Sequence, residues 1–364
     1  MSKSFFDEKV ATTDEIFSGK IGTLGFVAGA FDYFGLQEVI ERNLSKEGPN
    51  VKIDFYPMIK AMSMQLLNMP WQTLYGTEAF YEHLPCEGLL GVEGMDSHDL
   101  NRVNLARCLD AICEAGSQRL FIECAQSVVR KLGLKVECAH IDTTSMHYDG
   151  EGYKEEGCEV ELLPGYSRDH HPELNQIVSL MLCDNDSRLP LFQKSLSGNV
   201  SDKTSFFEFV KEDWGMLRQT FSELEYLVGD SALCTEKIFT EAQSSGIQII
   251  SRIPDSNNLS QRCFEQGKAG KFEDIDPDHP DGQLGMWCED GRIGGVPVKL
   301  LLVNNENMRM QKAKTINRHA LKEQQTAAAK LKKLETSPCK CRADADVSDL
   351  LICHKRCQQN CLVF

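Results

Sequence analysis

The spacing of apolar residues changes near Lys135, and this change limits the folds that the chain can adopt. From about residue 21 to 130, apolar residues recur at spacings of three and four, which is typical of amphipathic helices. After Lys135 the segments are short, rich in strand-forming residues and separated by turn residues. Their order is three strands, a helix, a strand, a helix and a strand. We therefore expect an all-helical domain followed by an α/β layer.

The same patterns predict six parts along the chain. The stretch from Asp255 is richer in Gly, Asp and Pro, which indicates a small β-rich insertion, and a long basic helix follows it. The predicted parts are an N-terminal tail at 1–20, a helical domain at 21–133, the first part of an α/β domain at 134–255, the insertion at 256–306, the basic helix at 307–336 and a Cys-rich tail at 337–364.

Composition and charge narrow the class of protein. The sequence has neither the apolar core of a signal peptide nor an apolar run of about 20 residues, so we expect a cytoplasmic protein. Most of the 15 cysteines stand singly in apolar segments, as buried thiols do. The formal charge of −15 argues against a surface that binds nucleic acid throughout. A local basic groove stays compatible with that total.

Two aspartates share one sequence context. Asp142 follows the apolar "CAHI" and Asp230 follows "YLVG", and small residues come after both. Catalytic groups gather at strand ends in α/β sheets, and carboxylates held there can bind Mg²⁺. The alternative is that these aspartates cap turns or helices. His140 is expected on the same side of its strand as Asp142, as a support for the metal site or as a packed histidine.

Several motifs resemble those of DDE transposases from bacterial insertion sequences, in the insertion-sequence-four superfamily. They are "HIDTTSMHYDG", "GYSRDHHPELNQIVSLML", "SLSGNVSDKTSF" and "VGDSALCTEKIF", with further likeness in "DLNRVNLARCLDAICEAG" and "QKAKTINRHALKEQQTAAAKLKKLE". The resemblance runs from about residue 20 to 348, with the motifs in the family's order. In "SGNVSDKTSF", Asn199 and Asp202 are expected to form a turn and cap the next helix.

The resemblance implies a ribonuclease-H-like catalytic domain with a β-rich insertion, preceded by an all-helical N-terminal domain. It implies that Asp142 and Asp230 are the first and second catalytic acids and ligate Mg²⁺ or Mn²⁺, with two ions in the complete site. The implied activity is cleavage of DNA at element ends with inverted repeats, then strand transfer to target DNA, by a homodimer in a bacterial cytoplasm. Arg168 and Arg252 are candidate DNA contacts.

The sequence departs from the family at the third acid. A glutamate on a helix after the insertion is expected, but Glu306, Glu323 and Glu335 lack the family's surrounding Tyr and Arg. We therefore expect a C-terminally truncated or frameshifted transposase whose last residues are translated out of frame. A zinc site made by Cys353, His354, Cys357 and Cys361 is the alternative for that segment. Alternatives for the whole chain are a non-catalytic DNA-binding or oligomerising remnant and another ribonuclease-H-like nuclease.

Overall fold

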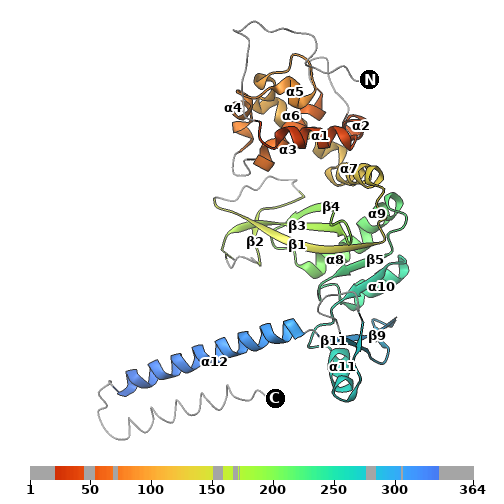
Figure 1. Ribbon diagram of the computed structural model, residues 1–364, viewed down its shortest axis with the longest axis vertical. Helices are drawn as coiled ribbons and strands as arrows, with labels where there is room; N and C mark the ends of the chain where they lie inside the picture. The colour runs from red at the N-terminus through yellow and green to blue at the C-terminus, as the bar shows by residue number, and fades with distance from the viewer. Residues whose placement is uncertain are drawn as a thin grey trace. The chain divides into compact units, whose positions relative to one another are not determined.

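The computed structural model describes most of the chain, and Figure 1 shows its course. The described residues are 21–44, 54–68, 73–150, 159–166, 171, 173–275, 284–304 and 306–335. The chain divides into two compact units, one formed by Met1–Gln261 with Asp290–Val298 and the other by Arg262–Glu289 with Lys299–Phe364. Within the described residues, no helix is long and apolar enough to cross a bilayer.

The first unit begins with helices, as the apolar spacing predicts. Asn101 fixes the start of one of them, because its side chain accepts hydrogen bonds from the backbone N–H groups of Val103 and Asn104. These helices are α1 (Leu24–Tyr33), α2 (Leu36–Asn43), α3 (Phe55–Asn68), α4 (Thr77–Tyr81), α5 (Cys86–Leu90), α6 (Arg102–Ala115) and α7 (Ser117–Leu132), with short 3₁₀ turns at Leu74–Gly76 and Ser97–Leu100.

A lysine lies inside this helical part. The side chain of Lys60, on α3, is only 1% exposed, and its Nζ lies 2.7 Å from Oδ1 of Asp32. The hydroxyl of Tyr56 donates to the same carboxylate oxygen at 2.8 Å. A buried ammonium is tolerated only when it is paired, so the carboxylate of Asp32 compensates both donors.

A second polar cluster joins α2 to α7. The carboxylate of Glu123 accepts hydrogen bonds from Arg42 at 2.6 Å, from Asn43 at 2.7 Å and from Arg119 at 3.1 Å. Burial of the Glu123 carboxyl raises its pKa, but the three hydrogen bonds outweigh burial and lower the pKa to about 2. The cluster therefore holds a charged carboxylate between two helices.

Helix α7 contributes to two apolar cores. Leu120 packs in the core of the helical part. Ile122, Ala125 and Val129 pack instead in the core under the β-sheet. The helix thus carries side chains for both cores over fewer than three turns, since one turn takes 3.6 residues.

The sheet of the first unit is mixed. Strands β4, β3 and β1 are antiparallel neighbours, and β1, β5 and β6 are parallel neighbours. The two-residue β2 pairs with the end of β3. The strands are β1 (Cys138–Tyr148), β2 (Leu163–Pro164), β3 (Asn175–Asp184), β4 (Pro190–Ser197), β5 (Tyr226–Gly229) and β6 (Gln248–Ser251). Apart from β2, their order along the chain is the predicted one.

Helices cover one face of this sheet in the described residues. Ala139, Ile141 and Leu227 point into that side and pack with Trp214 and Ile238 from the covering helices. The helices are α8 (Asp202–Glu208), a π-helical turn (Phe209–Asp213), α9 (Trp214–Thr220) and α10 (Glu236–Ser244). The alternate residues of the central strands, among them Asp142, Met181, Tyr226 and Ile250, are exposed on the opposite face.

The rest of the described chain holds short strands and two helices. Strands β7 (Glu273–Asp274), β8 (Leu284–Trp287) and β11 (Leu301–Asn304) form a small sheet, and β9 (Gly291–Ile293) pairs with β10 (Val296–Val298). The sequence prediction of a β-rich insertion missed helix α11 (Asn258–Ala269). Its apolar residues, among them the buried Cys263, are few, and the Gly, Asp and Pro residues around the helix indicated turns instead. Helix α12 (Glu306–Glu335) follows.

Candidate functional site

Asp142 lies in the middle of β1, on the exposed face of the sheet. Its neighbours Ile141 and Thr143 are buried on the covered face, because successive side chains of a strand point to opposite sides. The carboxylate oxygen Oδ1 of Asp142 accepts a hydrogen bond of 2.8 Å from the backbone N–H of Thr143. The strand thus presents the carboxylate on an open surface and also fixes its orientation.

Asp230 follows β5, the parallel neighbour of β1. The last paired residues are His140 and Val228, and continuing the same pairing two residues further sets Asp142 level with Asp230. Neighbouring strands lie about 5 Å apart, so we expect the two aspartates to lie near each other. The paired part of β5 itself ends at Gly229. The sequence predicted both at strand ends. Asp230 does follow its strand, whereas β1 continues for six residues beyond Asp142.

The turn after β5 holds Asp230 tightly. Oδ1 of Asp230 accepts a hydrogen bond of 2.8 Å from the backbone N–H of Ala232. The hydroxyl of Ser251, at the end of β6, donates to the carbonyl oxygen of Asp230 at 2.6 Å. Before it, Gly229 has no room for a side chain, because a Cβ there would lie 2.4 Å from Cδ1 of Leu233. Backbone contacts on both sides therefore limit the positions open to this carboxylate.

Arg252 is expected beside Asp230, so that Asp142, Asp230 and Arg252 form a row of charged residues across β1, β5 and β6. Gly229 pairs with Ser251, so the next step of the same pairing sets Asp230 level with Arg252. Arg252 is exposed, and its guanidinium lies 3.0 Å from Oδ1 of Asp255. An exposed ion pair of this kind contributes little to stability and can exchange for another anion. The other candidate DNA contact, Arg168, lies outside the described residues.

Asp202 reaches the site through Thr143. The sequence predicted Asp202 as part of a helix cap, but Ser201 caps α8, its side chain accepting from the backbone N–H of Thr204. Asp202 is the first helical residue, and its Oδ1 instead accepts a hydrogen bond of 2.6 Å from the hydroxyl of Thr143. Thr143 is 3% exposed. It thereby connects the Asp142 carboxylate, through its N–H, to Asp202, through its hydroxyl.

His140 lies on the same face as Asp142, as predicted. Its Nε2 is 2.8 Å from Oδ1 of Asn185, in the turn after β3. The backbone N–H of Asn185 also donates to the carbonyl oxygen of Cys138 at 2.9 Å. This contact favours the packed-histidine interpretation over a role as a metal ligand.

A polar patch adjoins Asp142 on the antiparallel side of the sheet, and sequence reasoning missed it. Gln193 on β4 donates hydrogen bonds to the hydroxyls of Ser179 at 3.1 Å and Ser195 at 3.2 Å. Ser179 pairs with Thr144 of β1, so the patch lies on the face that carries Asp142. The alternation of polar residues in "QKSLS" is the signal that could have indicated it.

The carboxylates of Asp142 and Asp230 supply some of the ligands that a hard divalent cation needs. Two carboxylates on one face are the protein ligands that Mg²⁺ usually takes, with water and phosphate oxygens as the remainder. Within the described residues, no group of three or more His, Cys, Asp or Glu side chains gathers where it could hold a metal. Glu323 lies on α12, in the second unit. The side chains of Glu306 and Glu335, and the Cys-rich tail, lie outside the described residues.

Comparisons with known proteins yield one family match and several structural likenesses. A family described as a domain of unknown function (DUF4277) matches residues 16–126, which includes most of the helical part. No curated protein matches the chain.

The similar solved structures include three transposase complexes. The Mos1 transposase paired-end complex with left transposon end is 8% identical, with a TM-score of 0.22, over 62% of this chain and 75% of that one. The piggyBac transposase synaptic complex with hairpin DNA is 10% identical, with a TM-score of 0.31, over 80% of this chain and 54% of that one. The Mos1 mariner paired end complex with Mn is 8% identical, with a TM-score of 0.22, over 66% and 72%. Likenesses this low assign no role to any residue of this chain.

Proposed function

We propose that the chain is a DDE transposase by descent, with a ribonuclease-H-like domain that acts on DNA through a divalent cation. The observation that carries the proposal is the parallel pairing of β1 with β5, which, continued by two residues, sets Asp142 level with Asp230; both residues are exposed. With the two-residue β2 set aside, those strands are the first and the fourth along the chain, as the resemblance of the motifs implies. If Asp142 and Asp230 only capped turns or helices, their level position across neighbouring strands would have no explanation.

Each residue of the row has a chemical task in this proposal. Asp142 and Asp230 hold Mg²⁺ or Mn²⁺, and Thr143 with Asp202 keeps the first carboxylate oriented. A cation held there supplies activation of the attacking oxygen and stabilisation of the leaving oxygen of a phosphodiester. Arg252, level with Asp230, can exchange its contact with Asp255 for a DNA phosphate, because guanidinium groups pair well with phosphate. The row thus arranges anionic ligands beside a cationic phosphate contact.

A second candidate is a non-catalytic remnant that keeps DNA-binding or oligomerising surfaces. One observation favours it, namely that no third acid joins Asp142 and Asp230 within the described part of the chain. Two carboxylates hold a first cation more readily than a second, so we expect cleavage by this chain alone to be weak. Metal binding and cleavage must therefore be measured separately.

The first experiment is a titration of the full chain with Mn²⁺, followed by electron paramagnetic resonance. Asp142→Asn and Asp230→Asn are each expected to weaken Mn²⁺ binding about ten-fold or more, by analogy with the losses known for metal-site changes. Glu212→Gln removes the same charge from an exposed residue of the π-helical turn on the covered side, so it serves as the control. Equal binding by all four proteins would refute the metal site.

The second experiment measures cleavage of duplex DNA from the two flanks of the coding region, with Mg²⁺ or Mn²⁺. Cleavage at inverted-repeat ends that both aspartate variants abolish would support an active transposase. Mn²⁺ binding without cleavage would support the remnant. Metal-dependent cleavage without preference for inverted-repeat ends would instead indicate another ribonuclease-H-like nuclease.

A further inference from the structure

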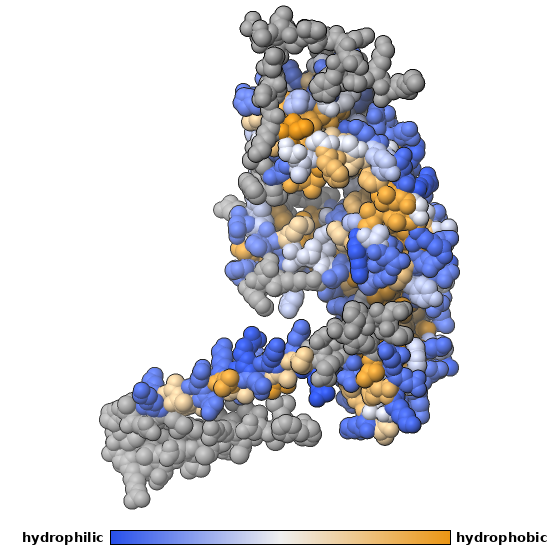
Figure 2. All heavy atoms as spheres, viewed as in Figure 1, coloured by the Kyte–Doolittle hydropathy of each residue, from blue (hydrophilic) through white to orange (hydrophobic). Residues whose placement is uncertain are grey.

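Most of the cations of helix α12 lie on one side of the helix. Its 30 residues contain eight Lys or Arg and three Glu, in a chain whose formal charge is −15. At about 100° per residue, seven of the eight cations fall within one arc of about 160°. Opposite that arc lie Ala313, Ile316, Ala320 and Ala327, together with the eighth cation, Arg309. Figure 2 shows the helix as mostly hydrophilic, with a few hydrophobic residues along it.

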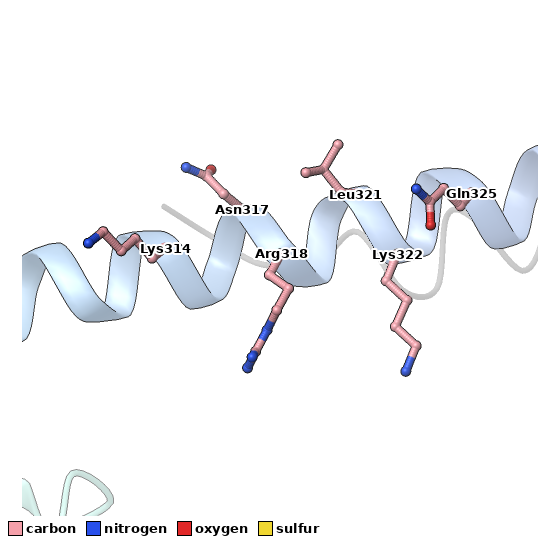
Figure 3. A pocket seen from close by; sticks show the side chains of 6 residues that line it. All are labelled: Lys314, Asn317, Arg318, Leu321, Lys322 and Gln325. Carbon is pink, nitrogen blue, oxygen red and sulfur yellow. The ribbon is translucent and has the colours of Figure 1, made fainter.

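Three of these cations form a regular row along the helix. Lys314, Arg318 and Lys322 are exposed and follow one another at intervals of four residues, a rise of about 6 Å at each step. Figure 3 shows Arg318 and Lys322 extending to the same side of α12, away from Leu321. The three side chains also line an open hollow of about 630 Å³ beside the helix. Such a row offers several positive charges to a linear polyanion.

The composition of α12 favours duplex over single-stranded DNA. Proteins that bind single strands use aromatic side chains on which bases stack, and α12 contains no Phe, Tyr or Trp. A duplex presents phosphates continuously, about one charge for every 1.7 Å of its axis. A 30-residue helix is about 45 Å long, which exceeds one turn of a duplex, about 34 to 36 Å.

We propose that the basic face of α12, centred on Lys314, Arg318 and Lys322, binds the phosphate backbone of duplex DNA. This inference rests on the proposed function, because it adds a DNA surface to the same protein. The surface is independent of the metal site, since it uses neither Asp142 nor Asp230. Its binding is nonspecific in sequence, as phosphate contacts are.

The test is duplex binding by the full chain in EDTA, measured by fluorescence anisotropy from 50 to 200 mM salt. Each phosphate contact adds about 0.9 to the slope of log affinity against log salt, so the triple variant K314Q, R318Q, K322Q should lower the slope by about 2 to 3. The control triple K203Q, K211Q, K237Q makes the same charge change on exposed residues over the covered side of the sheet. It is expected to leave the slope within about 0.5 of that of the unchanged chain.

A charge-preserving variant separates a lost contact from a lost helix. K314R, K322R keeps the charges and should bind with an unchanged slope, while circular dichroism shows that the glutamine triple keeps its helicity, since Gln favours helices. Equal slopes in both triples, or tighter binding of a single strand than of a duplex, would overturn the inference. If the inference is right, the Asp142→Asn and Asp230→Asn variants bind duplex DNA normally. A failure of the DNA-binding inference would therefore leave the Mn²⁺ result unaffected, and a failure of the metal site would leave the DNA-binding result unaffected.

Discussion

Removal of the Glu123 carboxylate should produce a pH-dependent loss of stability. Glu123 lies on α7 and is hydrogen-bonded by Arg42 and Asn43 of α2. Its side chain is 20% exposed, whereas those of Arg42 and Arg119 are 64% and 68% exposed. In Glu123→Gln the side-chain volume stays almost the same, but the negative charge and one strong acceptor are lost. The change therefore isolates the charge of the cluster.

The magnitude follows from the pKa. The pKa of Glu123 falls from its ordinary 4.5 to about 2, and 2.5 units correspond to about 3.4 kcal/mol. Both arginines are largely exposed and screened by water, which reduces the expected value to about 2 kcal/mol. Because the folded pKa is depressed, the stabilisation is fully present above pH 4.5. It is lost as the pH falls from 4.5 towards 2.

Urea unfolding followed by circular dichroism at 222 nm, at several pH values between 7 and 3, measures this effect. Glu123→Gln should be less stable than the unchanged chain by about 2 kcal/mol at pH 6, and the difference should shrink below pH 4.5. The matched control is Glu114→Gln, an exposed residue of α6. A difference that stays constant down to pH 3, or an equal loss in the control, would show that the carboxylate charge does not stabilise the cluster.

Two further changes test buried polar contacts. Asp32→Ala should lower the free energy of unfolding by about 3 kcal/mol, because it leaves the ammonium of Lys60 buried without its partner, whereas Lys60→Met should change it by less than about 1 kcal/mol. Thermal unfolding of both variants checks this, and equal losses would contradict it. Thr143→Val removes the hydroxyl that donates to Asp202 and should cost about 1 to 2 kcal/mol and weaken Mn²⁺ binding. A stability loss with unchanged Mn²⁺ affinity would show that Thr143 only supports the fold.

Local sequence patterns predicted most of the elements well, whereas the catalytic role of the two aspartates stays a prediction. The runs "CAHID" and "YLVGD" predict both a strand and the aspartate at its end. They can do so because the alternation of apolar and polar residues is a local property of the sequence. The sequence predicted only that Asp142 and Asp230 lie near each other at strand ends. The pairing of β1 with β5, which sets Asp142 level with Asp230 when continued by two residues, depends on a strand register that no local pattern specifies.

Contacts between residues far apart in the chain were the ones missed. Thr143 and Asp202 are 59 positions apart, and each has a sufficient local interpretation as a strand residue or a cap. Lys60 lies in a Met-rich helix, where a lysine is ordinarily taken as a solvent-facing residue. Only the approach of Asp32, 28 positions earlier, makes its burial possible. Long-range polar pairing is therefore where the sequence was least informative.

The packing of helix α7 limits how the helical part could be exchanged between proteins by recombination. The family match ends at residue 126, inside the helix and before Val129. Residues on both sides of that point pack under the sheet, whereas Leu120 packs with the helices. A helical part acquired by recombination would thus need a recipient sheet shaped to accept Ile122, Ala125 and Val129. A substitution on that side of α7 would therefore alter the packing beneath the strands as well as the helix itself.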